Sequence, residues 1–431
     1  MISFFQNSLE LFFYILLWGL LLFYYVSNNK RFTMGYVLIM LYFLQAIIAL
    51  FFYNNKLSVD YHNPLSYWNF LYLFVMMLMA LLPIVRLQEH KKAYIEIPNH
   101  SLITGLCLFF AVVSIVSILD LLPQIQKGMS LMMISNEDNI WDLYSESTEA
   151  RMSRKSFTGS LNIISILSNL SSKIMPLLFF TYFVKPHKNK IILYILAVSL
   201  LHGPLSGIAH ASRLQLISQL IIIFFLYFFF RPYIPKPDLR ILKRGGVALF
   251  SLVLLVFMTI TIARAERSDS GETLYNIERY FAQGPLNFNL HCMDANGTRE
   301  GHVVIPLLVH LAGGESLTEE QLRFKYSHMT IDNRLFSTYV GDFVLDFGPT
   351  ISFFLFALFS IIFCRVTTGK SGLNYGQVVS VYIVLRFCGG FYQYGFGSVD
   401  GNLALLVLII FSVFFSLNRS FIPKGEVIIK K

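Results

Sequence analysis

Hydrophobic runs of about 20 residues recur along the whole 431-residue chain and constrain its fold more than any other feature. Each run is long enough to cross roughly 30 Å of bilayer hydrocarbon as an α-helix. The composition agrees with this interpretation, because 55% of the residues are hydrophobic and only 14% are charged. The sequence therefore predicts an all-α polytopic integral membrane protein, with residues 1–431 forming a single membrane domain.

Eleven candidate spans lie near residues 7–26, 34–53, 66–85, 101–121, 159–183, 190–207, 212–230, 245–263, 338–364, 375–392 and 401–417. The first run has no basic residue before it and no small-residue cleavage pattern after it. We therefore expect this run to remain as a span and not to act as a signal peptide.

Basic residues gather in every second connection between the predicted spans. They are Lys30, Arg31, Arg86, Lys91, Lys92, Lys185, Lys188, Lys190, Arg231, Lys236, Arg240, Lys243, Arg244, Arg365, Lys370, Arg419, Lys424, Lys430 and Lys431. Connections rich in Lys and Arg face the cytoplasm in membrane proteins. The pattern predicts a periplasmic N-terminus, a cytoplasmic C-terminus and two long periplasmic loops, 122–158 and 264–337. It also accounts for the net charge of +9 without a nucleic-acid partner.

The motifs of several enzyme classes are missing from the sequence. It has no phosphate-binding GxxxxGK[ST] loop, no dinucleotide fingerprint and no HExxH, and its four cysteines form no CxxC pair. We therefore expect neither a metal nor a cofactor. The outer side of the inner membrane has no nucleotide supply, so an enzyme acting there needs an activated donor, such as a sugar on a lipid pyrophosphate.

Three arginines near the predicted outer boundary are candidates for binding phosphate. Arg264 and Arg267 lie three positions apart at the end of a span, so they share one helix face. Their guanidinium groups suit a pyrophosphate, although snorkelling to lipid phosphates is an alternative. Arg213 follows His210 in a very short turn near membrane depth, where an arginine needs a wet cavity or a structural carboxylate as its partner.

The 264–337 loop carries further candidates for chemistry. General base catalysis requires a group that titrates near the external pH, and among the outer histidines we favour His328, which precedes the next motif. Asp342 and Asp346 lie four apart at the outer end of a span, so both could face one side of a helix. They could orient the arginines, accept a proton from a sugar hydroxyl or cap the helix.

Two other features of this loop have more than one interpretation. Residues 301–311 are apolar but too short to span the membrane, so we expect an interfacial helix, with a re-entrant segment as the alternative. Aromatic residues in the loop suit a sugar surface but could equally be anchors at the membrane interface. They are Tyr275, Tyr280, Phe281, Phe288 and Tyr326.

The chain resembles the O-antigen polymerases and the wider oligosaccharide repeat-unit polymerase family of bacterial inner membranes. The resemblance rests on about eleven spans, a large outer loop before the last three, and the stretch 333–348, NRLFSTYVGDFVLDFG, in which an asparagine is followed by an Asp-Phe-Gly. Arg213, Arg264 and Arg267 also look like family features. The Arg-x10-Gly pattern of some members does not occur at these arginines or at Arg279.

The resemblance implies a membrane glycosyltransferase of the GT-C type. It would polymerise repeat units on undecaprenyl pyrophosphate during lipopolysaccharide biosynthesis, using lipid-linked oligosaccharide as donor and acceptor and a chain-length regulator protein as a further partner. Arg213, Arg264, Arg267 and Arg279, with His210 nearby, would hold the leaving pyrophosphate. His328 or one of the carboxylates of Asp346 and Asp342 would activate the acceptor hydroxyl.

Two other functions remain open at this point. An O-antigen ligase shares the arginines, the large loop and the lipid-linked donor, and the late Asp-Phe-Gly stretch favours the polymerase over it. A flippase of the same lipid-linked unit would place ionisable residues along several spans and show paired halves. Lys173 and Arg386 are the main ionisable residues within the predicted spans, and no half-repeat is visible.

Overall fold

The computed structural model describes residues 8–29, 32–87, 89–133, 160–209, 213–265, 273–315, 317, 319–331, 335–368, 372–390, 393–417 and 426–429. The chain divides into two compact units. The first comprises Met1–His90, Glu272–Thr368 and Val384–Asn402, and the second comprises Lys91–Gly271, Gly369–Ile383 and Leu403–Lys431. The expectation of one membrane domain stays a prediction.

The first unit starts with three apolar helices, α2 (Leu9–Asn28), α3 (Met34–Tyr53) and α4 (Tyr67–Arg86). Helix α2 packs against α3 and α4. Their contact is rich in aromatic rings, because the buried Trp18 stacks on Tyr42 with 4.9 Å between ring centroids and meets Phe74 edge-on at 5.1 Å. Glu89, in the short 3-10 helix η2 (Glu89–Lys91), accepts hydrogen bonds from the first backbone amides of α3.

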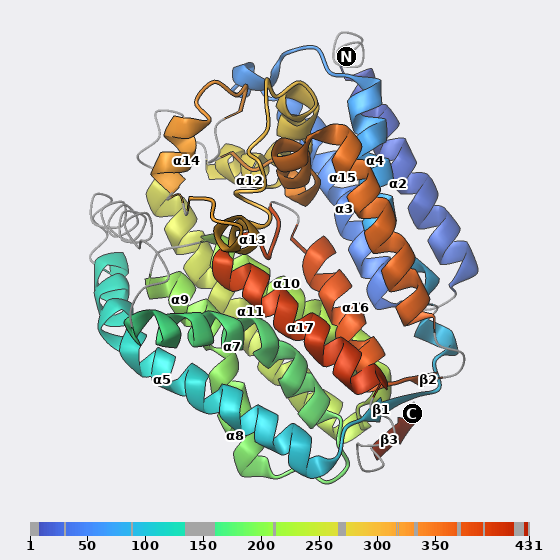
Figure 1. The fold of residues 1–431 in the computed structure, drawn as a ribbon, viewed down its shortest axis with the longest axis vertical. Coiled ribbons are helices and arrows are strands. Elements are labelled where there is room, and N and C mark those ends of the chain that lie inside the picture. The colour runs from blue at the N-terminus through green and yellow to red at the C-terminus, as the bar shows by residue number, and fades with distance from the viewer. Residues whose placement is uncertain are drawn as a thin grey trace. The chain divides into compact units, whose positions relative to one another are not determined.

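Residues 273–331 form short elements that belong to this first unit. They are α12 (Thr273–Asn287), the π-helical turn η4 (Phe288–Cys292), α13 (Pro306–Leu311) and α14 (Glu319–Lys325), and the 3-10 turn η1 (Val59–Tyr61) lies between α3 and α4. Helix α12 packs against α3, and η4 contacts α4 and α15 (Thr338–Thr367) (Figure 1). Of the apolar segment 301–311, only the second half is helical.

A π-helical turn often marks a functional site. In η4, the residue Asn289 is hydrogen-bonded to the start of α4. The amide of Asn289 accepts from the backbone N–H of Ser66 at 2.9 Å and donates to the carbonyl of Ser66 at 2.8 Å. The carbonyl of Asn289 also accepts from the side chain of Asn69 at 2.7 Å. The described residues at this end of the predicted outer loop are therefore folded onto the helices of their unit.

Helix α15 contains the stretch on which the family resemblance rests. It packs against α4 and changes direction at Gly348, where φ is 75° and ψ is 164°, just before Pro349. This conformation suits glycine, and proline cannot continue the hydrogen-bond pattern of a helix. The kink separates a buried first segment with Asp342 and Asp346 from an apolar second segment with exposed residues such as Phe354.

The second unit contains most of the remaining helices. They are α5 (His100–Met133), α7 (Ser160–Phe183), α8 (Lys190–Leu200), α9 (His202–Ala209), α10 (Arg213–Phe230), α11 (Lys236–Ala265) and the 3-10 turn η3 (Arg231–Tyr233). Helix α5 packs against α7, α8 and α9, and α10 packs against α7, α9 and α11. The chain leaves this unit within α16 (Tyr375–Cys388) and returns within α17 (Val399–Leu417).

A small sheet in the second unit joins distant parts of the sequence. Its strands are β1 (Tyr94–Ile97), β2 (Gly372–Leu373) and β3 (Glu426–Ile429), in the order β2-β1-β3. The central strand β1 runs parallel to β2, with Tyr94 opposite Gly372, and antiparallel to β3, with Ile95 opposite Ile428. The hydropathy pattern of the sequence did not predict these strands, which are only two to four residues long.

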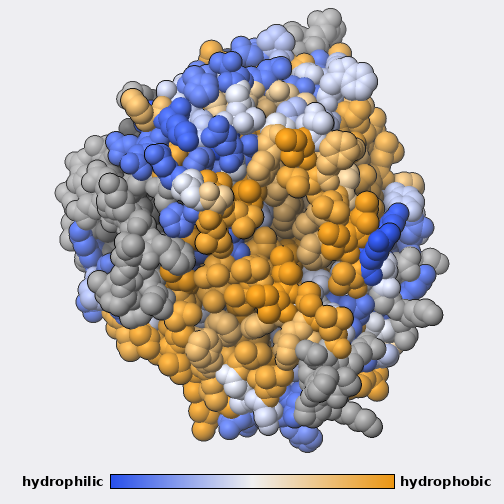
Figure 2. All heavy atoms as spheres, viewed as in Figure 1, coloured by the Kyte–Doolittle hydropathy of each residue, from blue (hydrophilic) through white to orange (hydrophobic). Residues whose placement is uncertain are grey.

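The structure confirms a predominantly helical protein with many long apolar helices. Among the described residues, nine helices have the length and composition of membrane spans, and α16 is a shorter apolar helix. Helix α5 continues past the predicted span end at residue 121 to Met133, whereas residues 134–158 of the predicted loop lie outside the described part. Figure 2 shows hydrophobic residues over α15 of the first unit and hydrophilic residues where α14 and its loops lie. The count of eleven, the GT-C arrangement and the sidedness stay predictions.

Candidate functional site

A buried arginine holds the two aspartates of α15. Arg299 lies in the loop between η4 and α13, and its Nε donates to Asp346 Oδ1 at 2.8 Å. Its Nη2 donates to the backbone carbonyl of Asp342 at 2.9 Å and lies 3.6 Å from Asp342 Oδ1. The side chain of Arg299 is 3% exposed and that of Asp346 0% exposed, so this is an ion pair removed from water.

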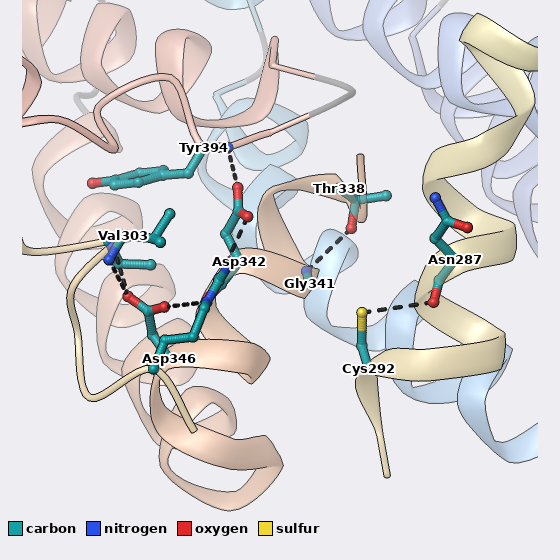
Figure 3. A network of polar contacts seen from close by, with 10 residues as sticks. Asn287, Cys292, Val303, Thr338, Gly341, Asp342, Asp346 and Tyr394 are labelled. Carbon is teal, nitrogen blue, oxygen red and sulfur yellow. Dashed lines mark hydrogen bonds and ion pairs between the residues drawn. The ribbon is translucent and has the colours of Figure 1, made fainter. Parts of the chain in front are cut away.

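The remaining carboxylate oxygens accept hydrogen bonds from backbone amides. Asp346 Oδ2 accepts from Val303 N at 3.0 Å and from Val304 N at 2.6 Å. Asp342 Oδ2 accepts from Tyr394 N at 2.7 Å, and Figure 3 shows the two carboxylates reaching toward these different segments. The second aspartate brings an extra negative charge, and three backbone donors help to stabilise it. We call Arg299, Asp342 and Asp346 the arginine centre.

The arginine centre connects three segments that are distant in sequence. It joins the 299–304 loop to the start of α15 and to the segment before α17. Asn402 adds to this connection, because its side chain donates to Val304 O at 2.9 Å and accepts from Leu307 N at 3.2 Å. Buried charges with complete sets of partners fix one arrangement of the backbone around them. The arginine centre therefore holds the 299–304 loop in place against α15.

The backbone before the apolar segment turns sharply. Positive φ angles occur at Asn296 (56°), Gly297 (136°), Glu300 (55°) and Gly301 (84°). A Cβ atom on Gly301 would lie 2.9 Å from Ile305 Cγ1, so a larger residue would not fit without movement. Positive φ at a residue such as Glu300 costs energy and is maintained by the surrounding structure. This conformation places Arg299 inside the protein and Glu300 at its surface.

The surface above the arginine centre carries a second group of polar side chains, which we call the surface cluster. It consists of the exposed Glu300, Lys325 and His328, the half-buried His302 and the buried ring of Tyr326 beneath them. Lys325 Nζ lies 3.4 Å from His302 Nε2 and 3.8 Å from Glu300 Oε2. Tyr326 Oη donates to Glu300 Oε2 at 3.4 Å, and its ring lies 6.1 Å from the ring of His302 and 6.3 Å from that of His328.

Two groups of the surface cluster have shifted pKa values. Burial and the nearby charge of Lys325 lower the pKa of His302, and Glu300 and Asp346 only partly oppose this effect. His302 therefore stays neutral at pH values where an ordinary histidine is half protonated. Burial and the carboxylate of Glu300 raise the pKa of Tyr326 to about 12, so its phenol stays protonated and can donate a hydrogen bond. The cluster thus combines a neutral imidazole, a cation and a phenol.

The structure brings together some of the predicted residues. Asp342 and Asp346 share one side of α15, as their spacing predicts, and His328 lies in the surface cluster next to Tyr326. Arg279 is on the exposed side of α12 near Tyr275, outside the cluster. Their proposed roles in catalysis and substrate binding stay predictions.

The other predicted residues belong to the second unit or to segments that the structure does not describe. Arg213 and Arg264 belong to α10 and α11, and only their backbone is described. His210 and Arg267 lie outside the described residues. Within the described residues, no group of three or more His, Cys, Asp or Glu side chains is placed to hold a metal ion.

Sequence reasoning did not single out Arg299 or His302. Both were visible only as members of longer series, Arg299 among the basic residues of the outer loop and His302 among its histidines. One available signal was that two carboxylates in an apolar helix require a cation. Another was that Arg299 lies between Asn296-Gly297 and Gly301, residue types that allow the tight turn which directs an arginine inward.

No protein family, no curated protein and no solved structure matches the chain.

Proposed function

We propose that this protein is a glycosyltransferase that polymerises oligosaccharide repeat units carried on undecaprenyl pyrophosphate at the periplasmic face of the inner membrane. A hydroxyl oxygen of the acceptor unit would attack the anomeric carbon of the donor. A new C–O bond forms, the bond between this carbon and the pyrophosphate oxygen breaks, and undecaprenyl pyrophosphate leaves. The hydroxyl proton passes to a base on the protein.

The observation that carries the proposal is the surface cluster on the folded connection between α11 and α15. The neutral imidazole of His302 would accept the hydroxyl proton, and the ammonium group of Lys325 would stabilise the negative charge on the leaving pyrophosphate. Tyr326 is only 5% exposed, so it supports these groups and does not face the substrate: its protonated phenol donates to Glu300, and its ring lies beside those of His302 and His328. The two groups assigned to the chemistry, His302 and Lys325, lie next to each other on this connection.

The arginine centre suggests a different role for the two aspartates from that of a catalytic base. Asp346 accepts hydrogen bonds from Arg299 and from two backbone amides. Both of its oxygens are occupied by these donors and its side chain is 0% exposed, so a substrate hydroxyl cannot reach it. We therefore propose that Asp342 and Asp346 position the surface cluster through Arg299, and that His302 serves as the base in place of His328.

The experiment is a gel of lipopolysaccharide from a host that lacks this gene. The host is complemented with the wild type, His302→Ala, Lys325→Ala or the control His62→Ala, all at matched membrane levels. His62 is an exposed histidine of the same unit and lies after η1, on another segment. We expect the first two variants to lose the ladder of long chains and to retain a band of core plus one repeat unit. The control keeps the ladder.

Each other pattern contradicts a part of the proposal. If the deletion removes every repeat unit from the core, the protein acts in ligation or in flipping and is not a polymerase. If the deletion gives the core-plus-one band but His302→Ala and Lys325→Ala restore a full ladder, the polymerase assignment stands and the surface cluster is not its site.

A further inference from the structure

Helix α11 of the second unit has an unusually exposed surface. Only 11% of its apolar 18-residue stretch is buried, compared with 22% to 56% of the corresponding stretch in the other long apolar helices among the described residues. It packs against α10, where Val253 joins the buried Leu216 and where Leu249 and Val256 add partly buried contacts. These α11 positions all lie on one side of the helix.

The opposite side of α11 changes from cationic to apolar along its length. Lys236, Arg240, Lys243 and Arg244 follow one another at helical spacing and are all exposed. The same side continues with Val247, Phe250 and Leu254, which are 59%, 53% and 45% exposed. One continuous helix face therefore presents four cations and then hydrocarbon, in the order in which a bilayer presents headgroups and acyl chains.

The cations of this face have no carboxylate partner among the described residues. The only acidic residue in this part of the helix is Asp238, which lies on another side and pairs with Lys188 at 2.5 Å. Gly245 and Gly246 mark the transition to the apolar part, and a Cβ atom on either would meet nothing within 4 Å. The backbone is therefore accessible at the level where the phosphate and glycerol of a lipid would lie.

We propose that this face of α11 is a binding site for anionic phospholipids, which place their phosphates against Arg240, Lys243 and Arg244 and their acyl chains along Val247, Phe250 and Leu254. Charge complementarity favours an anionic lipid over a partner helix at this face. A partner helix would leave the four cations without negative charges unless it carried acidic residues at the same level. The site is independent of the proposed glycosyl transfer, since it lies on a different unit from the surface cluster.

The test is native mass spectrometry of the full-length protein in detergent, titrated with dioleoyl phosphatidylglycerol or with dioleoyl phosphatidylcholine. The test variant carries Arg240→Gln, Lys243→Gln and Arg244→Gln. A matched control carries Arg86→Gln, Lys190→Gln and Arg365→Gln, which remove the same charge from exposed residues at the ends of other helices. A third variant, Arg240→Lys with Arg244→Lys, keeps the charge.

We expect the wild type to bind phosphatidylglycerol more tightly than phosphatidylcholine. Each neutralised cation should lower the affinity for the first phosphatidylglycerol molecule about 5-fold, so the triple variant should lose on the order of 100-fold in affinity. The matched control and the lysine variant should stay within about 3-fold of the wild type, because the site keeps its charge in both.

Two results overturn the proposal. Equal weakening in the test variant and the matched control would mean that the net charge attracts the lipid and that α11 holds no site. Wild-type affinity in the test variant would mean that the cations of α11 do not contact the lipid. If the triple variant cannot be purified, Arg240→Gln and Arg244→Gln alone decide the question, and an affinity for phosphatidylglycerol unchanged in both overturns the proposal.

Discussion

Arg299 and Glu300 are neighbours in sequence but belong to two regions with opposite properties. Arg299 is buried and bonded to a carboxylate that is 0% exposed, whereas Glu300 is 66% exposed and lies 3.8 Å from a lysine that is 41% exposed. Both regions contain an ion pair, and a simple count would treat the pairs as equivalent. Their surroundings differ, because water screens the outer pair and is excluded from the inner one.

The two regions have different roles, because the inner one supports the fold and the outer one carries the groups proposed for chemistry. A buried pair contributes little when complete but is costly when one partner is lost, so it holds its segments in a single arrangement. An exposed pair contributes little to stability, and its groups remain accessible to a substrate. The inner region therefore fixes the loop, and the outer region offers the reactive groups on that loop. The following predictions test this division.

The largest effect is expected for Arg299→Met. The variant leaves Asp346 and Asp342 buried without their cation, which should cost about 3–5 kcal/mol in the free energy of unfolding. We expect a strongly reduced amount of protein in the membrane and a lower melting temperature for whatever can be purified in detergent. Arg279→Met, at an exposed position on α12, is the control and should change stability by about 0.5 kcal/mol or less. Similar melting temperatures for the two variants would contradict a supporting role of Arg299.

The two aspartates should differ from each other. Asp346→Asn places a neutral amide beside Arg299 Nε, a donor that lies 2.8 Å from the carboxylate in the wild type. We expect the free energy of unfolding to fall by about 3 kcal/mol. Asp342→Asn can still accept from Tyr394 N, and its oxygen lies 3.6 Å from Arg299, so about 1 kcal/mol is expected. Denaturation in mixed micelles compares the variants under identical conditions. The reverse order would mean that Asp342 is the main partner of Arg299.

Lys325→Gln tests the chemistry of the outer region. In an assay with purified lipid-linked substrate, loss of this cation should lower kcat by about 100-fold if the cation stabilises the leaving pyrophosphate. The lysine also lowers the pKa of His302, so the rate of the wild type should persist as the pH falls through 6.5 and decline only below it. In the variant the pKa rises, and the acidic limb moves to higher pH.

The melting temperature of Lys325→Gln serves as the control for this experiment and should match that of the wild type. An acidic limb at the same pH in both proteins would show that His302 does not determine the pH dependence of the rate. A loss of rate that a lower melting temperature accounts for would assign Lys325 a structural role.

The smallest effect is expected for Glu300→Gln. This change breaks the exposed pair with Lys325, and we expect less than about 0.5 kcal/mol of change in stability. The measurement is the same denaturation in mixed micelles as for the aspartates. A loss comparable to that of Asp346→Asn would remove the distinction between the inner and the outer region.

Much of the helical part of the fold could be predicted from hydropathy, because a long apolar run has few alternatives in a bilayer. The predicted span 34–53 coincides with α3, and 66–85 differs from α4 by one residue at each end. The extension of α5 to Met133 was not predicted, because residues after 121 are more polar and hydropathy marks only the part of a helix within the membrane. The short sheet was not predicted, because its strands have too few residues to give a periodic hydropathy signal.

The site could be predicted only in part. The spacing of Asp342 and Asp346 predicted a shared helix face, since helical periodicity is local. Their partner Arg299 could not be selected, because its position depends on a turn with four positive φ angles and on packing against α15. His302 is a candidate because Lys325 lies beside it, and no local sequence pattern predicts that these two positions are close in space.

The strand order β2-β1-β3 also has a consequence for biosynthesis. β1 emerges early from the ribosome, but both of its partners, β2 and β3, are translated after all the helices of the first unit up to α15. The middle strand therefore waits with two unpaired edges during most of translation, and exposed strand edges are prone to wrong pairing. A slower or interrupted synthesis of the C-terminal region would prolong this interval, so misassembly of the second unit should depend on the rate of translation.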